Sequence, residues 1–413
     1  MEKWETYMAK YFHGWNIVGA SIFGFSASPG QFAFAALGIF TIPLGIEFGW
    51  SREEISLATM IFTITQAFAT AVVGRMVDNY GAKEVLIPSI IIFGVLLAAI
   101  PLLVTELWHL YALFFLIGVL TAGSAAVPYL RIISAWFKKN RGLAFGITMA
   151  GGGIGYMYVP PMLQYLITHH GWRFGYYALA AIVLFAALPL VYKVVKNTPQ
   201  EVGLTPDGRA AQEQGEEEQI ENLISLTTLL KDKVFWILYA TIGLLTFSLF
   251  GLMFHFVPML IDRGAEDMTA ALAFTFLGTT VTISRVGVGF LLDKIFAPRL
   301  AMICILLSTI GVIILSTGAS GALTFVAAIF LGFSIGAELD LLAYLTTRYF
   351  GLGSFGMVYG ILFSAFLFGV STGPYAYGVA YETYGSYINM LMVCVGVLIM
   401  ASLLMFLMPK YRE

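Results

Sequence analysis

Long apolar runs follow one another along all 413 residues, separated by short segments that contain charged residues, glycine or proline. A bilayer hydrocarbon core of about 30 Å requires roughly 20 apolar residues per helix. The runs are continuous and do not show the alternation of a barrel strand, so they predict helices. We therefore expect an all-α membrane protein with twelve transmembrane helices, near residues 15–44, 52–77, 84–104, 107–135, 142–169, 173–194, 234–262, 268–292, 299–318, 322–347, 354–381 and 385–408.

One polar stretch interrupts this pattern after the sixth run. The segment TPQEVGLTPDGRAAQEQGEEEQIEN, residues 198–222, is rich in Gly, Pro, Gln and Glu and has too few apolar residues to build a core. It divides the chain into an N-terminal six-helix half (1–194), a linker (195–233) and a C-terminal six-helix half (234–413).

The two halves also resemble each other in sequence. Gly74 and Asp78 recur as Gly289 and Asp293, at an offset of 215 residues. Two equal halves in parallel repeat suit a transporter, because rocking one half against the other exposes a central site to each side of the membrane in turn. A channel does not require this duplication.

Composition and charge agree with a membrane protein and set its orientation. The chain is 59% hydrophobic and 11% charged, whereas a soluble domain has roughly 25% charged residues. Counted by alternate loops, 17 Lys and Arg residues fall on one side of the membrane and three on the other, which leaves only Arg131 and Arg285 within the spans. The positive-inside rule then places both termini and the linker in the cytoplasm, and we expect a plasma (inner) membrane protein.

Three segments resemble motifs of a known superfamily and of one family within it. The segment from Gly74 to Lys83, GRMVDNYGAK, resembles the loop signature of the major facilitator superfamily, with Asn79 and Ala82 departing from it. The segment WFKKNRGLAFG, residues 136–146, resembles the fifth-helix motif of the monocarboxylate transporters, and His13-Gly14-Trp15 is similar to the end of their first-helix motif. The resemblance implies the major facilitator fold over the whole chain.

Arg285 is the most informative single residue. Charge at the bilayer centre costs at least about 2.5–3.5 kcal/mol, so a charged residue inside a span is a functional hypothesis by default. It lies about 12 Å from Asp293 along a helix, too deep for simple snorkelling. An ion pair with Glu338 or Asp340, or a gate between the halves, would also explain it. A guanidinium also matches a carboxylate bidentately.

The resemblance favours the last interpretation. In monocarboxylate transporters and the related oxalate/formate exchangers, an arginine of the eighth helix binds the substrate carboxylate, and Arg285 matches that position. Animal members carry an aspartate one turn before this arginine, where this chain has Val281, and a first-helix lysine that this chain does not have between Lys10 and Lys83. A proton carrier must therefore lie elsewhere.

Glu338 and Asp340 are the candidate proton carriers. Two residues apart on a helix corresponds to about 200° of rotation, so only one of them can face a given partner. A carboxylate beside Arg285 could couple proton uptake to anion arrival. Equally, these acids could simply neutralise Arg285 or stabilise the contact between the halves.

Further candidates come from polar residues in the spans and from the loops. We expect substrate contacts from His255, Tyr129, Tyr344, Tyr359 and Tyr375, although each also has an ordinary packing explanation. Arg131, Asp78 and Asp293 are candidates for gating or for the charge of the vestibule. The segments SASPGQ, AGGGIGYMYVPP and GVSTGPYAYG predict interrupted helices, which often mark a binding pathway.

These features together predict a secondary active transporter of a small organic monocarboxylate such as lactate or pyruvate. We expect proton-coupled symport by alternating access from a monomer in the lipid bilayer. Exchange of organic anions without protons is the first alternative, and a non-transporting membrane sensor or partner protein is the second. Neither a catalytic constellation nor metal-ligand spacing stands out, so we expect no enzyme, no cofactor, no metal and no nucleic-acid partner.

Overall fold

The computed structural model describes residues 13–137, 141–208, 225–292, 294–351 and 355–411, which form helices without a strand among them. The N-terminal half contains α2 (Gly14–Ser26), η1 (Gly30–Ala35), α3 (Ala36–Phe48), α4 (Arg52–Tyr80), α5 (Ala82–Leu103), α6 (Leu107–Leu120), η2 (Ala122–Ser124), α7 (Ala126–Trp136), α8 (Arg141–His170), α9 (Trp172–Ala181), η3 (Ile182–Ala187) and α10 (Leu188–Val194). The described parts of the linker form η4 (Pro199–Val202), η5 (Pro206–Gly208) and α11 (Leu226–Leu229). The C-terminal half contains α12 (Lys233–Asp262), α13 (Asp267–Leu292), α14 (Ala297–Ser316), α15 (Ala322–Phe350), α16 (Phe355–Tyr384) and α17 (Ile388–Phe406).

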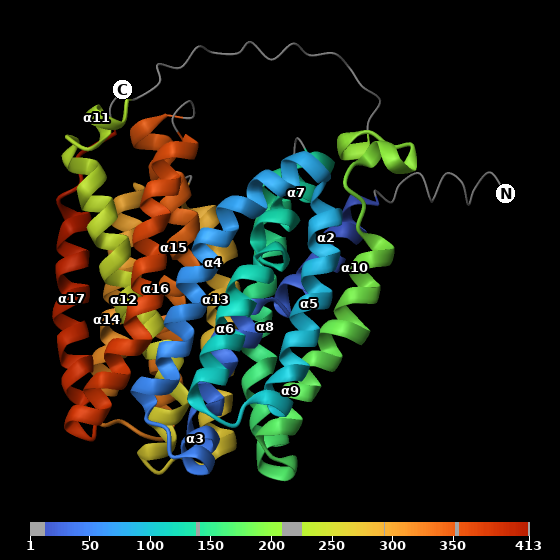
Figure 1. Cartoon of the computed structure of the whole chain (residues 1–413). Coiled ribbons are helices and arrows are strands. Elements are labelled where there is room, and N and C mark those ends of the chain that lie inside the picture. Colours follow the sequence, from blue (N-terminus) through green and yellow to red (C-terminus); the bar gives the residue numbers. More distant parts are fainter. Residues whose placement is uncertain (1–12, 138–140, 209–224, 293, 352–354, 412–413) are drawn as a thin grey trace.

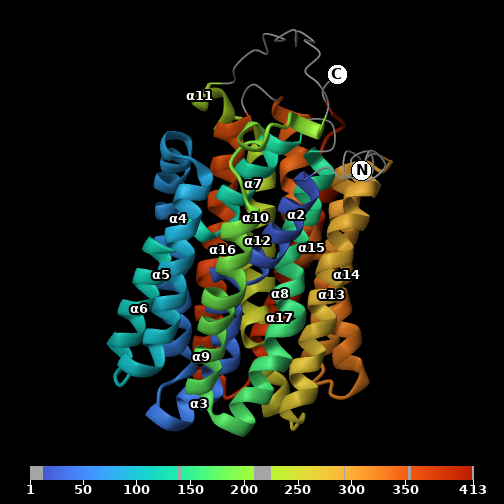
Figure 2. The same cartoon turned by 90° about the vertical axis from the view of Figure 1, so that its right-hand side faces the viewer.

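The helices stand side by side as long rods (Figure 1). In the turned view α10 and α12 overlap near the middle, and α4 and α14 lie on opposite flanks (Figure 2). We call the end where α10 and α17 finish, and where α11 lies, the linker end (Figure 1). The other end, where α3 finishes and α4 begins, is called the opposite end.

Each of the twelve predicted spans coincides with one helix or one series of helices. Within the described residues, ten of these spans are long and apolar enough to cross a membrane. The pair α6 and α7, which is bent by 57°, brings the number to eleven if it is counted as one span. The remaining rod is α8, with 30 residues. The prediction of an all-α membrane protein is therefore confirmed.

The first span is interrupted, as its SASPGQ segment predicts. α2 ends at Ser26, and the chain continues after Pro29 as a π-helix, η1. Proline has no backbone N–H for helix hydrogen bonding, and π-helical turns recur at functional sites. The break leaves Gln31 buried, with 4% of the residue exposed, where its side chain packs against Gly155 of α8.

The predicted interruptions of the fifth and eleventh spans are wrong. α8 continues through Pro160 and Pro161, and α16 continues through Pro374. Most of the glycines here allow other helices to come close. A Cβ added at Gly155, for example, would lie 2.5 Å from the carbonyl oxygen of Ser26.

The two halves meet along α8 and α13 and along α4 and α16. A Cβ at Gly278 of α13 would lie 2.7 Å from backbone atoms of Tyr156 and Met157 of α8, so the two helices touch through their backbones. The Thr275 hydroxyl donates to the Met157 carbonyl at 2.8 Å. This close contact brings α8 side chains of the first half against the charged residues of the second.

Candidate substrate site and inter-half latch

Arg285 lies on α13, seven residues before that helix ends at Leu292. Its side chain is only 13% exposed, and its Nη1 lies 4.0 Å from Oδ2 of Asp340 on α15. This separation exceeds hydrogen-bond length, so the pair is electrostatic and loose. Among the described residues, Nε of Arg285 has no hydrogen-bond partner. The Nε–H of the guanidinium is therefore available to donate to a further acceptor.

Asp340 and Glu338 have different surroundings, as their rotation around α15 predicts. Asp340 is within ion-pair distance of Arg285 and its side chain is 34% exposed. Glu338 is 3% exposed and lines a small apolar pocket between α12, α14, α15 and α17. In the described part of the chain, its Oε2 has no hydrogen-bond partner. Asp340, and not Glu338, forms the ion pair with Arg285.

The N-terminal half contributes a chain of polar groups to the same place. The Ser28 hydroxyl donates to Oε1 of Gln31 at 2.6 Å, which turns the Gln31 amide nitrogen away from Ser28. Tyr156 interacts with the Gln31 side chain and electrostatically with Arg285. The Gln31 amide nitrogen can only donate, so its contact with the Tyr156 oxygen leaves the Tyr156 O–H proton available to another acceptor.

Gln31 and Tyr156 are missing from the predicted site residues. The signals that could have indicated them are their positions inside the predicted helix breaks, SASPGQ and AGGGIGYMYVPP. Tyr359 of α16, which is among the predicted residues, also interacts electrostatically with Asp340 and Arg285. We call Arg285, Asp340, Tyr359 and Tyr156 the Arg285 site.

The structure does not bring the other predicted tyrosines to this site. Tyr129 is fully buried within the N-terminal half, with its ring 6.2 Å from that of Phe25, and its hydroxyl has no partner among the described residues. Tyr344 interacts with Tyr411, near the linker end. Tyr375 donates to Oε1 of Glu53 at 2.8 Å, near the opposite end.

Of the three predicted gating residues, Arg131 and Asp78 belong to helices α7 and α4. Arg131 is an exposed residue of α7, and its carbonyl accepts a hydrogen bond from Ser134. Asp78 belongs to the last turns of α4, but its side chain lies outside the described part of the structure. Asp293 lies outside the described residues altogether.

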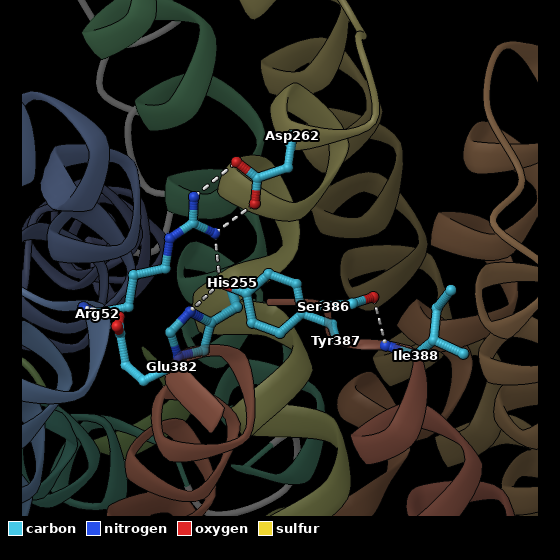
Figure 3. Close-up of polar contacts among 7 residues, drawn as sticks. All are labelled: Arg52, His255, Asp262, Glu382, Ser386, Tyr387 and Ile388. Atoms are coloured by element: carbon cyan, nitrogen blue, oxygen red, sulfur yellow. Dashed lines mark hydrogen bonds and ion pairs between the residues drawn. The ribbon is translucent and has the colours of Figure 1, made fainter. Parts of the chain in front are cut away.

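A second charged cluster joins the halves at the opposite end (Figure 3). Arg52, the first residue of α4, makes a bidentate ion pair with Asp262, the last residue of α12, with both N···O distances at 2.6 Å. Its Nη1 also donates to the Tyr387 hydroxyl at 2.6 Å. The Arg52 backbone N–H donates to Glu382 at 2.9 Å, and the guanidinium lies 3.9 Å from the centre of the Tyr381 ring.

His255 is fully buried behind this cluster, and both of its ring nitrogens are engaged. Nε2 lies 2.9 Å from the Pro374 carbonyl, and Nδ1 lies 2.9 Å from the Tyr387 hydroxyl. The Tyr387 hydroxyl is a phenol, which keeps its proton at neutral pH. We call Arg52, Asp262, Tyr387 and His255 the latch.

Comparison with known proteins identifies the class. Residues 21–374 match the family model described as Major Facilitator Superfamily, and the chain belongs to that family. Its members are membrane transporters and not enzymes, which confirms the prediction that this chain is a transporter.

The individual relatives are distant. The chain is 26% identical to the MFS transporter asaE of Aspergillus flavus, over 77% of this chain and 69% of the relative. It is 24% identical to Monocarboxylate transporter 13 of Bos taurus, over 73% of this chain and 66% of the relative. It is also 24% identical to Monocarboxylate transporter 2 of Rattus norvegicus, over 94% of this chain and 81% of the relative. The resemblance to monocarboxylate transporters is thus confirmed at low identity.

A solved structure shares the fold. It is the crystal structure of a bacterial homolog to the human lysosomal transporter Spinster, described as inward-facing and unoccupied. The two chains superpose with a TM-score of 0.73 at 16% sequence identity, over 96% of this chain and 97% of the other. The predicted major facilitator fold is therefore confirmed.

Proposed function

We propose that this transporter carries a small organic monocarboxylate, such as lactate or pyruvate, together with a proton. The observation that carries this proposal is the loose pair of Arg285 and Asp340, in which a buried guanidinium retains an uncommitted donor. The low-identity relatives named monocarboxylate transporters support the choice of substrate class.

Anion binding follows from the donors that converge at this site. A carboxylate fits the planar fork of Arg285, and the contact is strong where water is scarce. The Tyr156 hydroxyl, which interacts with Gln31 and Arg285, can donate its proton to the same anion. The anion would then be held by one residue from each half of the protein.

Proton coupling follows from competition for Arg285. Asp340 is the counter-ion of the guanidinium at 4.0 Å before substrate arrives. An arriving carboxylate takes this place, and Asp340 is left with less compensation for its negative charge, so that it binds a proton more readily. The pair therefore links binding of the anion to binding of a proton. Glu338, which is buried nearby, remains a second candidate carrier.

The substrate class follows from charge and surroundings. One guanidinium matches one carboxylate, which favours a monoanion over a dicarboxylate. Exchange of organic anions without a proton remains the first alternative, because the same arginine would bind them equally well. A non-transporting sensor or partner protein is the second, and the lack of anion movement would distinguish it.

The orientation and organisation follow the sequence argument. We propose that the linker end lies in the cytoplasm and the opposite end outside a plasma (inner) membrane, with the transporter acting as a monomer. The division into residues 1–194, 195–233 and 234–413 would let the two halves rock against each other. Contacts such as the Arg52–Asp262 pair would then close the outward side in this conformation.

The test is uptake of labelled lactate, pyruvate and oxalate into proteoliposomes, with and without an inward proton gradient. We expect gradient-driven uptake of the monocarboxylates that Arg285→Ala abolishes. Arg173→Ala is the matched control, because that arginine pairs with Glu47 away from the site. Uptake that requires internal anion and ignores the gradient would indicate exchange. Wild-type transport by Arg285→Ala would contradict the proposed role of Arg285.

A further inference from the structure

The hydrogen-bond directions of the latch can be assigned from its chemistry (Figure 3). A carbonyl oxygen only accepts, so His255 donates from Nε2 to the Pro374 carbonyl. In a neutral ring Nδ1 is then an acceptor, and the Tyr387 O–H donates to it. The Tyr387 oxygen is thereby left with its lone pairs free to accept from Nη1 of Arg52.

The latch residues come from both halves of the protein. Arg52 belongs to the first half, whereas Asp262, Tyr387 and His255 belong to the second. If the Tyr387 hydroxyl were rotated away from His255, its proton would point at the Arg52 donor, and the hydrogen bond between Arg52 and Tyr387 would be lost. The side chain of Arg52 is only 13% exposed, so water cannot readily replace the lost partner.

We propose that His255 is a positioning residue for this latch: its ring orients the Tyr387 hydroxyl toward Arg52 and so stabilises closure of the opposite end. Among the described residues, the hydrogen bonds of the His255 ring go to the Pro374 carbonyl and the Tyr387 hydroxyl, and not to Arg52 or Asp262. The inference rests on membership of a transporter family, whose two halves must separate at this end during the cycle. It does not depend on which substrate is carried.

The structure offers a probe for opening of this end. Ser56 lies one turn after Arg52 on α4, is fully buried, and faces α16, where a Cβ at Gly378 would lie 2.7 Å from its hydroxyl. Ser56→Cys is a small change that becomes reactive only when α4 and α16 separate. Cys304 and Cys394 are both buried, and the protein without Ser56→Cys measures their background reaction.

The experiment measures the rate of labelling of the Ser56→Cys protein by a bulky maleimide. We expect His255→Leu to raise the rate roughly tenfold, because a hydrogen bond to a charged group is lost. Tyr387→Phe should do the same while keeping the histidine and both rings. His255→Asn should return the rate toward that of the parent, because its side-chain oxygen can accept from Tyr387 near the position of Nδ1.

Non-additivity separates positioning from simple packing. If His255 acts through Arg52, then Arg52→Gln combined with His255→Leu labels no faster than Arg52→Gln alone. Additive effects, or an unchanged rate in both His255→Leu and Tyr387→Phe, would overturn the proposal. Thermal unfolding of each variant checks the fold. If His255→Leu does not fold, His255→Gln takes its place in the cycle, because its longer side chain moves the amide oxygen away from the position of Nδ1.

Discussion

Removing one hydroxyl group, with Tyr156→Phe, tests whether the two halves share the anion. Tyr156 is the α8 residue that interacts electrostatically with Arg285 and contacts the Gln31 side chain. The substitution keeps the ring, and so keeps the close contact of α8 with Gly278 of α13. It removes only the O–H that the proposed mechanism directs at the substrate.

The expected size of the effect follows from the kind of bond lost. A hydrogen bond to a charged group contributes about 1.5–3 kcal/mol, which corresponds to roughly 10–150-fold in affinity. The lower value applies here, because the Gln31 side chain interacts with Tyr156 and its amide can turn toward the anion in place of the lost hydroxyl. We therefore expect KM for the monocarboxylate to rise about tenfold, with a smaller change in the maximal rate.

The measurement is the concentration dependence of labelled lactate or pyruvate uptake by proteoliposomes. Tyr176→Phe is the matched control: Tyr176 is also a buried tyrosine of the first half, stacked on Phe40 with 4.1 Å between the ring centres. Its hydroxyl has no partner among the described residues, so its loss should leave KM unchanged.

Two results would refute the reasoning. If Tyr156→Phe and Tyr176→Phe both leave KM unchanged, the anion is not bound by Tyr156. If both raise KM equally, the effect comes from general changes in the first half and not from a lost contact to the substrate.

Three further predictions test the pair and the helix contact. Arg285→Ala should lower the free energy of unfolding by about 1–2 kcal/mol, because it leaves a partly screened Asp340 charge unpaired. Adding Asp340→Asn should restore stability in thermal unfolding but should not restore transport. A double variant as unstable as Arg285→Ala would contradict this prediction. Asp340→Asn alone should retain anion exchange, measured by counterflow, and lose proton-driven accumulation; accumulation at the wild-type level would rule out Asp340 as the carrier. Gly278→Ala should destabilise the fold by about 1–3 kcal/mol, because its methyl group would lie 2.7 Å from the α8 backbone. Gly287→Ala is the control, because the space around Gly287 is open. Equal unfolding temperatures for the two variants would contradict the close contact.

The helices could be predicted from the apolar runs, but the breaks within them could be predicted only in part. Only the first of three Gly- and Pro-rich spans is interrupted, at Pro29 and the π-helix that follows. In α8, glycines such as Gly153 and Gly155 face Thr282 and Gln31 and allow close helix contact. Glycine can mark a break in a helix or allow another helix to come close. Which of the two occurs depends on the neighbouring helix, which the local sequence does not specify.

The charged part of the Arg285 site was predictable because a charge inside an apolar run is conspicuous. Rotation around α15 also predicts that Glu338 and Asp340 face different surroundings, and only Asp340 lies within ion-pair distance of Arg285. Tyr156 and Gln31 were missed because uncharged polar and aromatic residues are common in helices. Their part in the site depends on which helices of the two halves touch.

The latch was not predictable for a similar reason, and its position has a mechanistic consequence. Arg52 begins a span and resembles an ordinary interfacial arginine, yet it pairs with Asp262, 210 residues later in the chain. The latch therefore joins the halves at the opposite end, whereas Arg285 pairs with Asp340 within the second half alone. An anion held by Arg285 and Tyr156 would add a second bridge between the halves, deeper in the bundle. Opening of the opposite end breaks the Arg52 contacts, and the free energy of those contacts is lost. A bound anion that keeps the halves together at α8 and α13 would offset part of this lost free energy.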